Sequence, residues 1–71
     1  MSESDIYKLV GGRIKYIRES RKLTQQQLSD MCNIEKTNLS RIEAGRTNIT
    51  LKNLFKLSKA LDVSLKEIVD V

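Results

Sequence analysis

One short stretch near the middle of the chain constrains the fold most, because it combines a helix start, a turn and a helix end. Thr24 followed by Gln27 is the pattern of a capping box, in which each side chain satisfies the other residue's backbone N–H. Asn33 tolerates left-handed backbone and suits a tight turn. Gly45 suits the left-handed end of a second helix. The two expected helices span about 24–33 and 36–44.

The preceding segment predicts one longer helix. Apolar residues recur there at intervals of three and four, which is typical of an amphipathic helix that begins near Ser4 or Asp5 and ends near Arg21. Gly11 and Gly12 weaken it, by roughly 1 kcal/mol each relative to Ala. Close approach of another helix and fraying of the first turn both explain them.

Two further helices are expected after the central pair. Thr50 is suited to cap a fourth helix, and Ser64 with Glu67 forms another capping-box pattern before a short helix at about 65–69. The chain contains no proline, linker or repeat. We therefore expect one all-α domain over residues 1–71, a compact bundle of five short helices. The expected core residues are Ile6, Val10, Ile14, Ile17, Leu28, Cys32, Leu39, Ile42, Leu51, Leu54, Leu57 (or Phe55) and Leu61.

The residue inventory excludes several classes of protein. With one Cys and no His, the chain offers neither an internal disulfide nor a metal site. It also lacks a glycine-rich phosphate loop and a clustered pair of carboxylates, so we expect no catalytic residue, no cofactor and no enzyme. No signal peptide or membrane-length apolar run is present, which predicts a soluble cytoplasmic protein.

The charge is concentrated in the middle of the sequence. Residues 8–59 hold 12 of the 13 bases and four of the nine acids. A basic middle is the electrostatic pattern of a nucleic-acid binder, although a solvated lysine-rich surface explains it equally well.

The order of these signals resembles the Cro/phage-repressor type of helix-turn-helix, the XRE family, over about residues 9–69. The motif itself covers about residues 24–45. The resemblance implies a lambda-repressor-like fold and sequence-specific binding of double-stranded DNA, with the second motif helix in the major groove. The matching blocks are RIKYIR at 13–18, LTQQQLS at 23–29, LSRIEAG at 39–45, LKNL at 51–54 and ALDVSL at 60–65.

The chain departs from the family pattern at three positions. Asn33 replaces the Gly often found in the turn, Glu35 replaces the usual Ser or Thr cap, and Ile49 replaces a common Pro. Glu35 suits the helix dipole but places a negative charge near DNA, unless it points away or accepts from a cytosine amino group. The run from Arg46 through Leu51 also resembles controller proteins of restriction-modification systems.

Three side chains are expected to read bases. Thr37 and Arg41 lie four apart and share a helix face, with Lys36 beside them. Arg41 suits guanine as a bidentate donor, Lys36 offers a looser version, and Thr37 can present its methyl group to thymine. An ordinary solvated helix face is the alternative explanation.

A second set is expected to contact the DNA backbone. Gln25 opens its helix, where a phosphate suits the free N–H groups. Arg13 and Lys52 are outer candidates that solvent exposure explains equally well. The remaining backbone candidates are Asn38, Ser40, Arg46 and Asn48.

Other residues are interpreted as structural. The resemblance implies an ion pair between Arg18 and Glu43 that holds the reading helix at its angle. Cys32 is expected to be an inert core residue, and Tyr7 and Tyr16 are expected to pack rather than stack on bases.

The limited area of one reading head favours a homodimeric repressor or autoregulator on a palindromic operator. Apolar residues at the C-terminal end suggest its interface, unless they all pack within the monomer. The alternatives are an antitoxin or adaptor that binds a protein partner and a non-specific nucleic-acid binder. No membrane contact or small-molecule ligand is expected. The candidate interface residues are Val63, Leu65, Ile68 and Val69.

Overall fold

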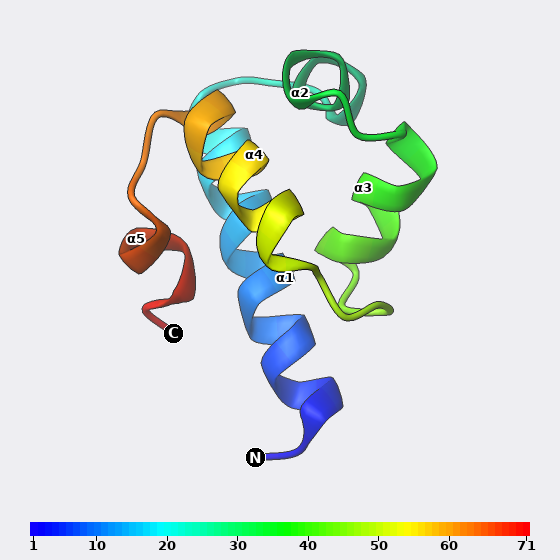
Figure 1. Ribbon diagram of the computed structural model, residues 1–71, viewed down its shortest axis with the longest axis vertical. Helices are drawn as coiled ribbons and strands as arrows, with labels where there is room; N and C mark the ends of the chain where they lie inside the picture. Colours follow the sequence, from blue (N-terminus) through cyan, green and yellow to red (C-terminus); the bar gives the residue numbers. More distant parts are fainter.

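Five helices follow one another in the computed structural model, which describes residues 1–71 (Figure 1). The long helix α1 runs the length of the molecule, with α4 in front of its upper part and α5 to one side (Figure 1). Helices α2 and α3 form a bent pair at the other side, so the all-α fold class predicted from the sequence is confirmed. The helices are α1 Glu3–Ser20, α2 Gln25–Cys32, α3 Lys36–Glu43, α4 Leu51–Leu61 and α5 Leu65–Val69.

Capping boxes set the start of three helices. Those expected at Thr24 and Ser64 are present. Helix α1 begins earlier than expected because Ser2 and Asp5 form a third box: Asp5 N–H donates to Ser2 Oγ at 3.2 Å, and Ser2 N–H donates to Asp5 Oδ2 at 3.0 Å. This backbone hydrogen bond from Ser2 holds the pKa of Asp5 below its ordinary value.

Left-handed residues close the turns. Asn33 has φ 55° and ends α2, as its tolerance of that region predicted. Gly45 has φ 72° just after α3, and Lys22 and Asp62 adopt similar angles after α1 and α4.

The core lies where α1, α2, α3, α4 and α5 meet, and it contains most of the expected residues. The fourth helix is the exception, because Leu51 is 73% exposed and Phe55 is 56% exposed. Leu57 and Leu61 are buried and Leu54 is half-buried, so they define the inward face of α4. Leu51 and Phe55 lie one turn apart on its outer face, and the expectation that Leu51 is buried was wrong. The buried apolar residues are Val10, Ile14, Ile17, Leu28, Cys32, Ile34, Leu39, Ile42, Leu57, Leu61 and Ile68.

Close approach of α3 explains Gly11. A Cβ atom there would overlap the carbonyl oxygen of Ile42 and lie 3.1 Å from that of Glu43. Gly12 has open space around it and no such role.

Helix α5 is attached to α1 by one polar contact as well as by the core. Arg13 Nε donates to the carbonyl oxygen of Glu67 at 3.0 Å. The Arg13 guanidinium carbon also lies 5.6 Å from the centroid of the Tyr16 ring. Tyr16 is 63% exposed, so the expectation that it is a packing residue was wrong, whereas Tyr7 is half-buried.

No helix combines the length and the apolar character needed to cross a bilayer.

Candidate nucleic-acid interface

Helix α3 presents a polar ridge to solvent. Leu39, Ile42 and Glu43 are buried, and the 3.6-residue period therefore turns Thr37 and Arg41 outward. Both are exposed, as expected of residues that read bases.

An open hollow lies on each side of this ridge. Towards α2 the hollow is bounded by Gln25, Lys36 and Ser40, together with the two ridge residues. The hollow towards α4 is lined by Asn33, Ile34, Glu35, Thr37, Asn38, Arg41 and Asn53. A convex helix between two polar hollows has the form needed to enter a groove whose two rims carry phosphates.

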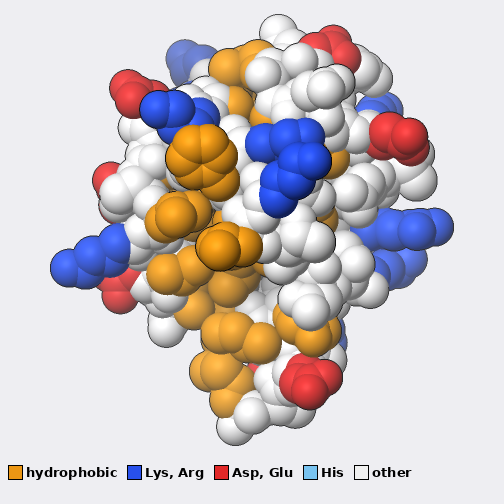
Figure 2. All heavy atoms as spheres, in the orientation of Figure 1, with side chains coloured by type: hydrophobic (Ala, Val, Ile, Leu, Met, Phe, Trp, Pro, Cys, Tyr) orange, Lys and Arg blue, Asp and Glu red, His pale blue; other side chains and the backbone are white.

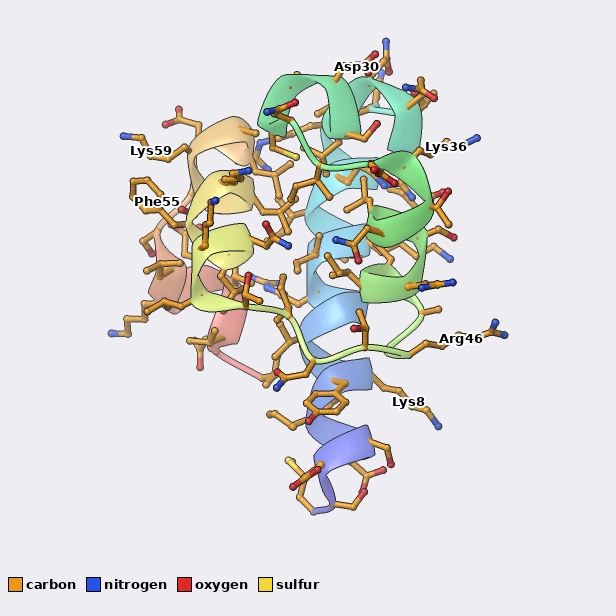
Figure 3. All side chains as sticks on the ribbon, turned by 45° about the vertical axis from the view of Figure 1, so that its right-hand side comes forward. Lys8, Asp30, Lys36, Arg46, Phe55 and Lys59 are labelled. Atoms are coloured by element: carbon orange, nitrogen blue, oxygen red, sulfur yellow. The ribbon has the colours of Figure 1, made fainter.

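The interface holds cations without protein partners. Every ion pair in the structure involves Arg18, so Lys36, Arg41 and Arg46 are unpaired. Figure 3 shows Lys36 and Arg46 projecting from the same side of the molecule. A surface of unpaired cations attracts a polyanion.

The loop after α3 supplies the second part of the interface. Arg46 and Asn48 are exposed, and Arg46 N–H donates to the carbonyl oxygen of Arg41 at 3.0 Å. This bond fixes the loop to the end of α3, so the position of Arg46 follows that of the ridge.

A buried ion pair fixes the angle of α3 against α1. Arg18 Nε lies 2.7 Å from Glu43 Oε2, and Arg18 Nη2 donates to Glu43 Oε1 at 3.0 Å. Arg18 Nη1 also donates to the carbonyl oxygen of Leu23 at 2.7 Å. The hydrogen bonds to Glu43 raise the pKa of Arg18 above its ordinary value. The structure thus contains the pair that the family resemblance implied.

Gln25 has a structural contact that the sequence did not reveal. Its Nε2 donates to Glu43 Oε1 at 3.1 Å, so one carboxylate holds residues of α1, α2 and α3 together. One N–H of the Gln25 side-chain amide is therefore already used in a hydrogen bond within the protein. The expected phosphate contact would rest on the backbone N–H of Gln25 and on the rest of its amide.

Two other side chains considered as DNA contacts, Arg13 and Glu35, have different environments in the structure. Arg13 turns towards α5 and Glu67, away from the ridge, which removes it from the outer phosphate candidates. Glu35 is the N-cap of α3 without a side-chain capping bond, so its carboxylate stands free in the hollow beside Arg41.

Asn53 was missed by the sequence analysis. It lies in the first turn of α4 and faces Asn38 and Arg41 across the hollow. Its position three residues after the cap Thr50 was the available signal, because polar first-turn residues of neighbouring helices can meet.

The expected dimer residues have different environments. Ile68 is fully buried in the core, so it cannot contribute to a dimer surface, and that expectation was wrong. Val63 is half-buried against the core. Leu65 and Val69 are 36% and 47% exposed.

No group of three or more His, Cys, Asp or Glu side chains could hold a metal ion.

Against known families, a model described as Helix-turn-helix matches residues 14–68. The chain belongs to this helix-turn-helix family.

Its relatives include regulators of two kinds. Control protein C.BamHI of Bacillus amyloliquefaciens is 37% identical over 68 residues, which cover 94% of this chain and 84% of that protein. The immunity repressor protein of Bacillus phage phi105 is 43% identical over 60 residues, or 84% of this chain and 42% of that protein.

Solved structures of restriction-modification controller proteins have the same fold as this chain. The restriction-modification controller protein C.AhdI from Aeromonas hydrophila superimposes with a TM-score of 0.86 at 27% identity, covering 87% of this chain and 94% of that one. Wild-type C.Esp1396I, another such controller, gives 0.82 at 32% identity, covering 92% and 87%. The helix-turn-helix chain is accordingly a sequence-specific DNA-binding transcriptional regulator of the XRE type and not an enzyme.

Proposed function

We propose that this helix-turn-helix regulator reads an operator by placing α3 in the major groove. The observation that carries the proposal is the exposed ridge of Thr37 and Arg41 between two polar hollows. Arg41 donates to guanine and Thr37 presents its methyl group to thymine. Lys36, at the first turn of α3, contacts a neighbouring base edge.

The residues flanking the ridge hold the protein in register on the sugar-phosphate backbone. Gln25 and Ser40 border the hollow towards α2, and Asn38 borders the hollow towards α4. Arg46 and Asn48 extend this contact from the loop after α3. These groups carry little sequence information, because every phosphate presents the same oxygens.

The regulator acts as a homodimer on a palindromic site, through the outer face of α4 and α5. Exposed apolar side chains gather over these two helices and the start of α1 (Figure 2). Leu51 and Phe55 of α4 belong to this face, with Leu65 and Val69 of α5. Val63 borders it. The partner is a second copy because a symmetric pair of half-sites, about one helical turn apart, matches a two-fold dimer.

The biological output is repression or autoregulation in the cytoplasm, without a small-molecule ligand. The relatives named as a control protein and an immunity repressor support this assignment. Nothing in the geometry favours an antitoxin or adaptor role.

Selection from a random duplex library at near-physiological salt tests the proposal. Enrichment of a palindrome is the expected result. Retention without enrichment would leave a charge-driven binder, and no retention would favour a protein partner. Weighing the free protein in solution tests the dimer separately.

A further inference from the structure

The first turns of α1 lie outside residues 14–68, which the family model matches. Helix α1 itself begins at Glu3. The early start depends on the Ser2–Asp5 capping box, which makes these turns regular helix. The backbone position of each side chain in these turns is therefore fixed by the helix.

Lys8 in these first turns lies directly against the end of the motif. A Cβ atom placed on Gly45 would lie 2.6 Å from Lys8 Cα and 2.5 Å from Lys8 Cγ. Only a glycine lets the loop approach the helix so closely. The stem of Lys8 is thus held beside the residue that precedes Arg46.

The ammonium group of Lys8 forms no ion pair and points to the same side of the molecule as Lys36 and Arg46 (Figure 3). Lys8 itself is exposed. Asp5, one turn earlier, accepts from the backbone N–H of Ser2 and forms no ion pair with Lys8. The hydrogen bonds from Ser2 and, after them, the charge of Lys8 lower the pKa of Asp5. Figure 3 shows Lys8 projecting from the same side as Lys36 and Arg46, below Arg46 along the long axis.

We propose that Lys8 is a further DNA-binding residue that contacts a backbone phosphate outside the half-site read by α3. This inference rests on the proposed binding of α3 to duplex DNA. Lys8 supplies a flexible point charge, so it adds affinity without base preference. Arg46 and Lys8 then follow one strand outward from the groove.

Two variants separate charge from packing. Lys8→Met keeps the methylene stem against Gly45 and removes the charge, whereas Lys8→Arg keeps both. Lys59→Gln removes the same charge from the opposite side of the molecule (Figure 3) and is the matched control. Because Lys59 Nζ lies 5.9 Å from the centroid of the Phe55 ring in the proposed dimer face, sedimentation must first show that this variant keeps the wild-type oligomeric state. Thermal unfolding of each variant verifies that the fold is retained.

Affinity for the selected operator is measured as a function of salt. Lys8→Met should weaken binding to all sequences alike and reduce the slope of log affinity against log salt by about 0.9 for each phosphate that the variant leaves without a cation. Lys8→Arg and Lys59→Gln should retain the wild-type slope. An unchanged slope in Lys8→Met would overturn the inference.

Trimming the DNA provides a test that needs no variant. Wild-type protein should show the same reduction in slope when base pairs flanking the half-sites are removed, and Lys8→Met should then show no further reduction. If removing the flanking base pairs left the slope of the wild-type protein unchanged, the proposed role of Lys8 would be overturned. Failure of the wild type to bind any duplex would instead contradict the proposed function.

Discussion

Gly11 of α1 lies so close to Ile42 of α3 that a methyl group on Gly11 would overlap the Ile42 carbonyl oxygen. Since that oxygen belongs to backbone, the overlap cannot be relieved by a side-chain rotation. The first and third helices are therefore in contact at backbone distance, which fixes the separation of α3 from α1.

The neighbouring glycines provide a matched pair of variants. Gly11→Ala should destabilise the fold by about 1–3 kcal/mol, because α1 and α3 must separate. Gly12→Ala meets open space and should stabilise it by about 0.5–1 kcal/mol through helix propensity. Urea unfolding of both measures the difference, and equal effects would contradict this account of Gly11.

Breaking the buried ion pair should be costly. Arg18→Met leaves the carboxylate of Glu43 buried with only the amide of Gln25, so we expect a loss of about 3–5 kcal/mol. Replacing both residues, as in Arg18→Met with Glu43→Leu, should recover much of that loss because no charge then remains buried. The two free energies of unfolding test this. A double variant as unstable as Arg18→Met would show that geometry rather than charge burial dominates.

The two exposed arginines should differ in DNA binding. Arg41→Ala should cost about 1–3 kcal/mol and relax the preference at one base pair, whereas Arg46→Ala should weaken every sequence similarly. Binding to the selected operator and to its single-base variants distinguishes the two patterns. Weaker binding without relaxed preference in both variants would remove Arg41 from the base readers.

The thiol of Cys32 should be protected. Burial raises its pKa, so the folded chain keeps the proton at a pH where the unfolded chain has begun to lose it. Stability is therefore expected to decline as pH rises above the ordinary thiol value of about 8.5. Labelling with a thiol reagent at a pH of about 8 should be slow in buffer and fast in denaturant. Rapid labelling of the folded protein would contradict the burial of Cys32.

The dimer proposal depends on exposed rather than buried apolar residues. Phe55→Asp or Val69→Asp should lower the mass in solution from dimer to monomer with little loss of helix content, because both side chains are exposed. Ile68→Ala should instead destabilise the monomer by about 2–5 kcal/mol. Sedimentation at several concentrations compares them. An unchanged mass in both Asp variants would place the interface elsewhere.

Local signals in the sequence predicted the helix order because each acts within a few residues. The Thr24 and Ser64 capping boxes and the Asn33 turn are examples. The same local signals did not predict the outer face of α4. Leu51 fits the same apolar spacing as Leu54, but it is exposed in the structure.

Contacts between distant residues could not be derived from spacing. The bond from Gln25 to Glu43 joins positions 18 apart, and the lysine stem against Gly45 depends on how α1 crosses the loop. The Arg18–Glu43 pair was anticipated only through family resemblance. The exposed ridge of Thr37 and Arg41 was anticipated from helical periodicity, and whether it reads bases remains a prediction.

One carboxylate joining three helices has a consequence for the choice of operator. Glu43 binds both Arg18 and Gln25, so α3 cannot tilt against α1 and α2 without breaking these hydrogen bonds. On the proposed palindromic operator, a protein that does not deform leaves the DNA to bend or twist until both half-sites are contacted. We therefore expect the base pairs between the half-sites, although untouched, to favour easily deformed pyrimidine–purine steps.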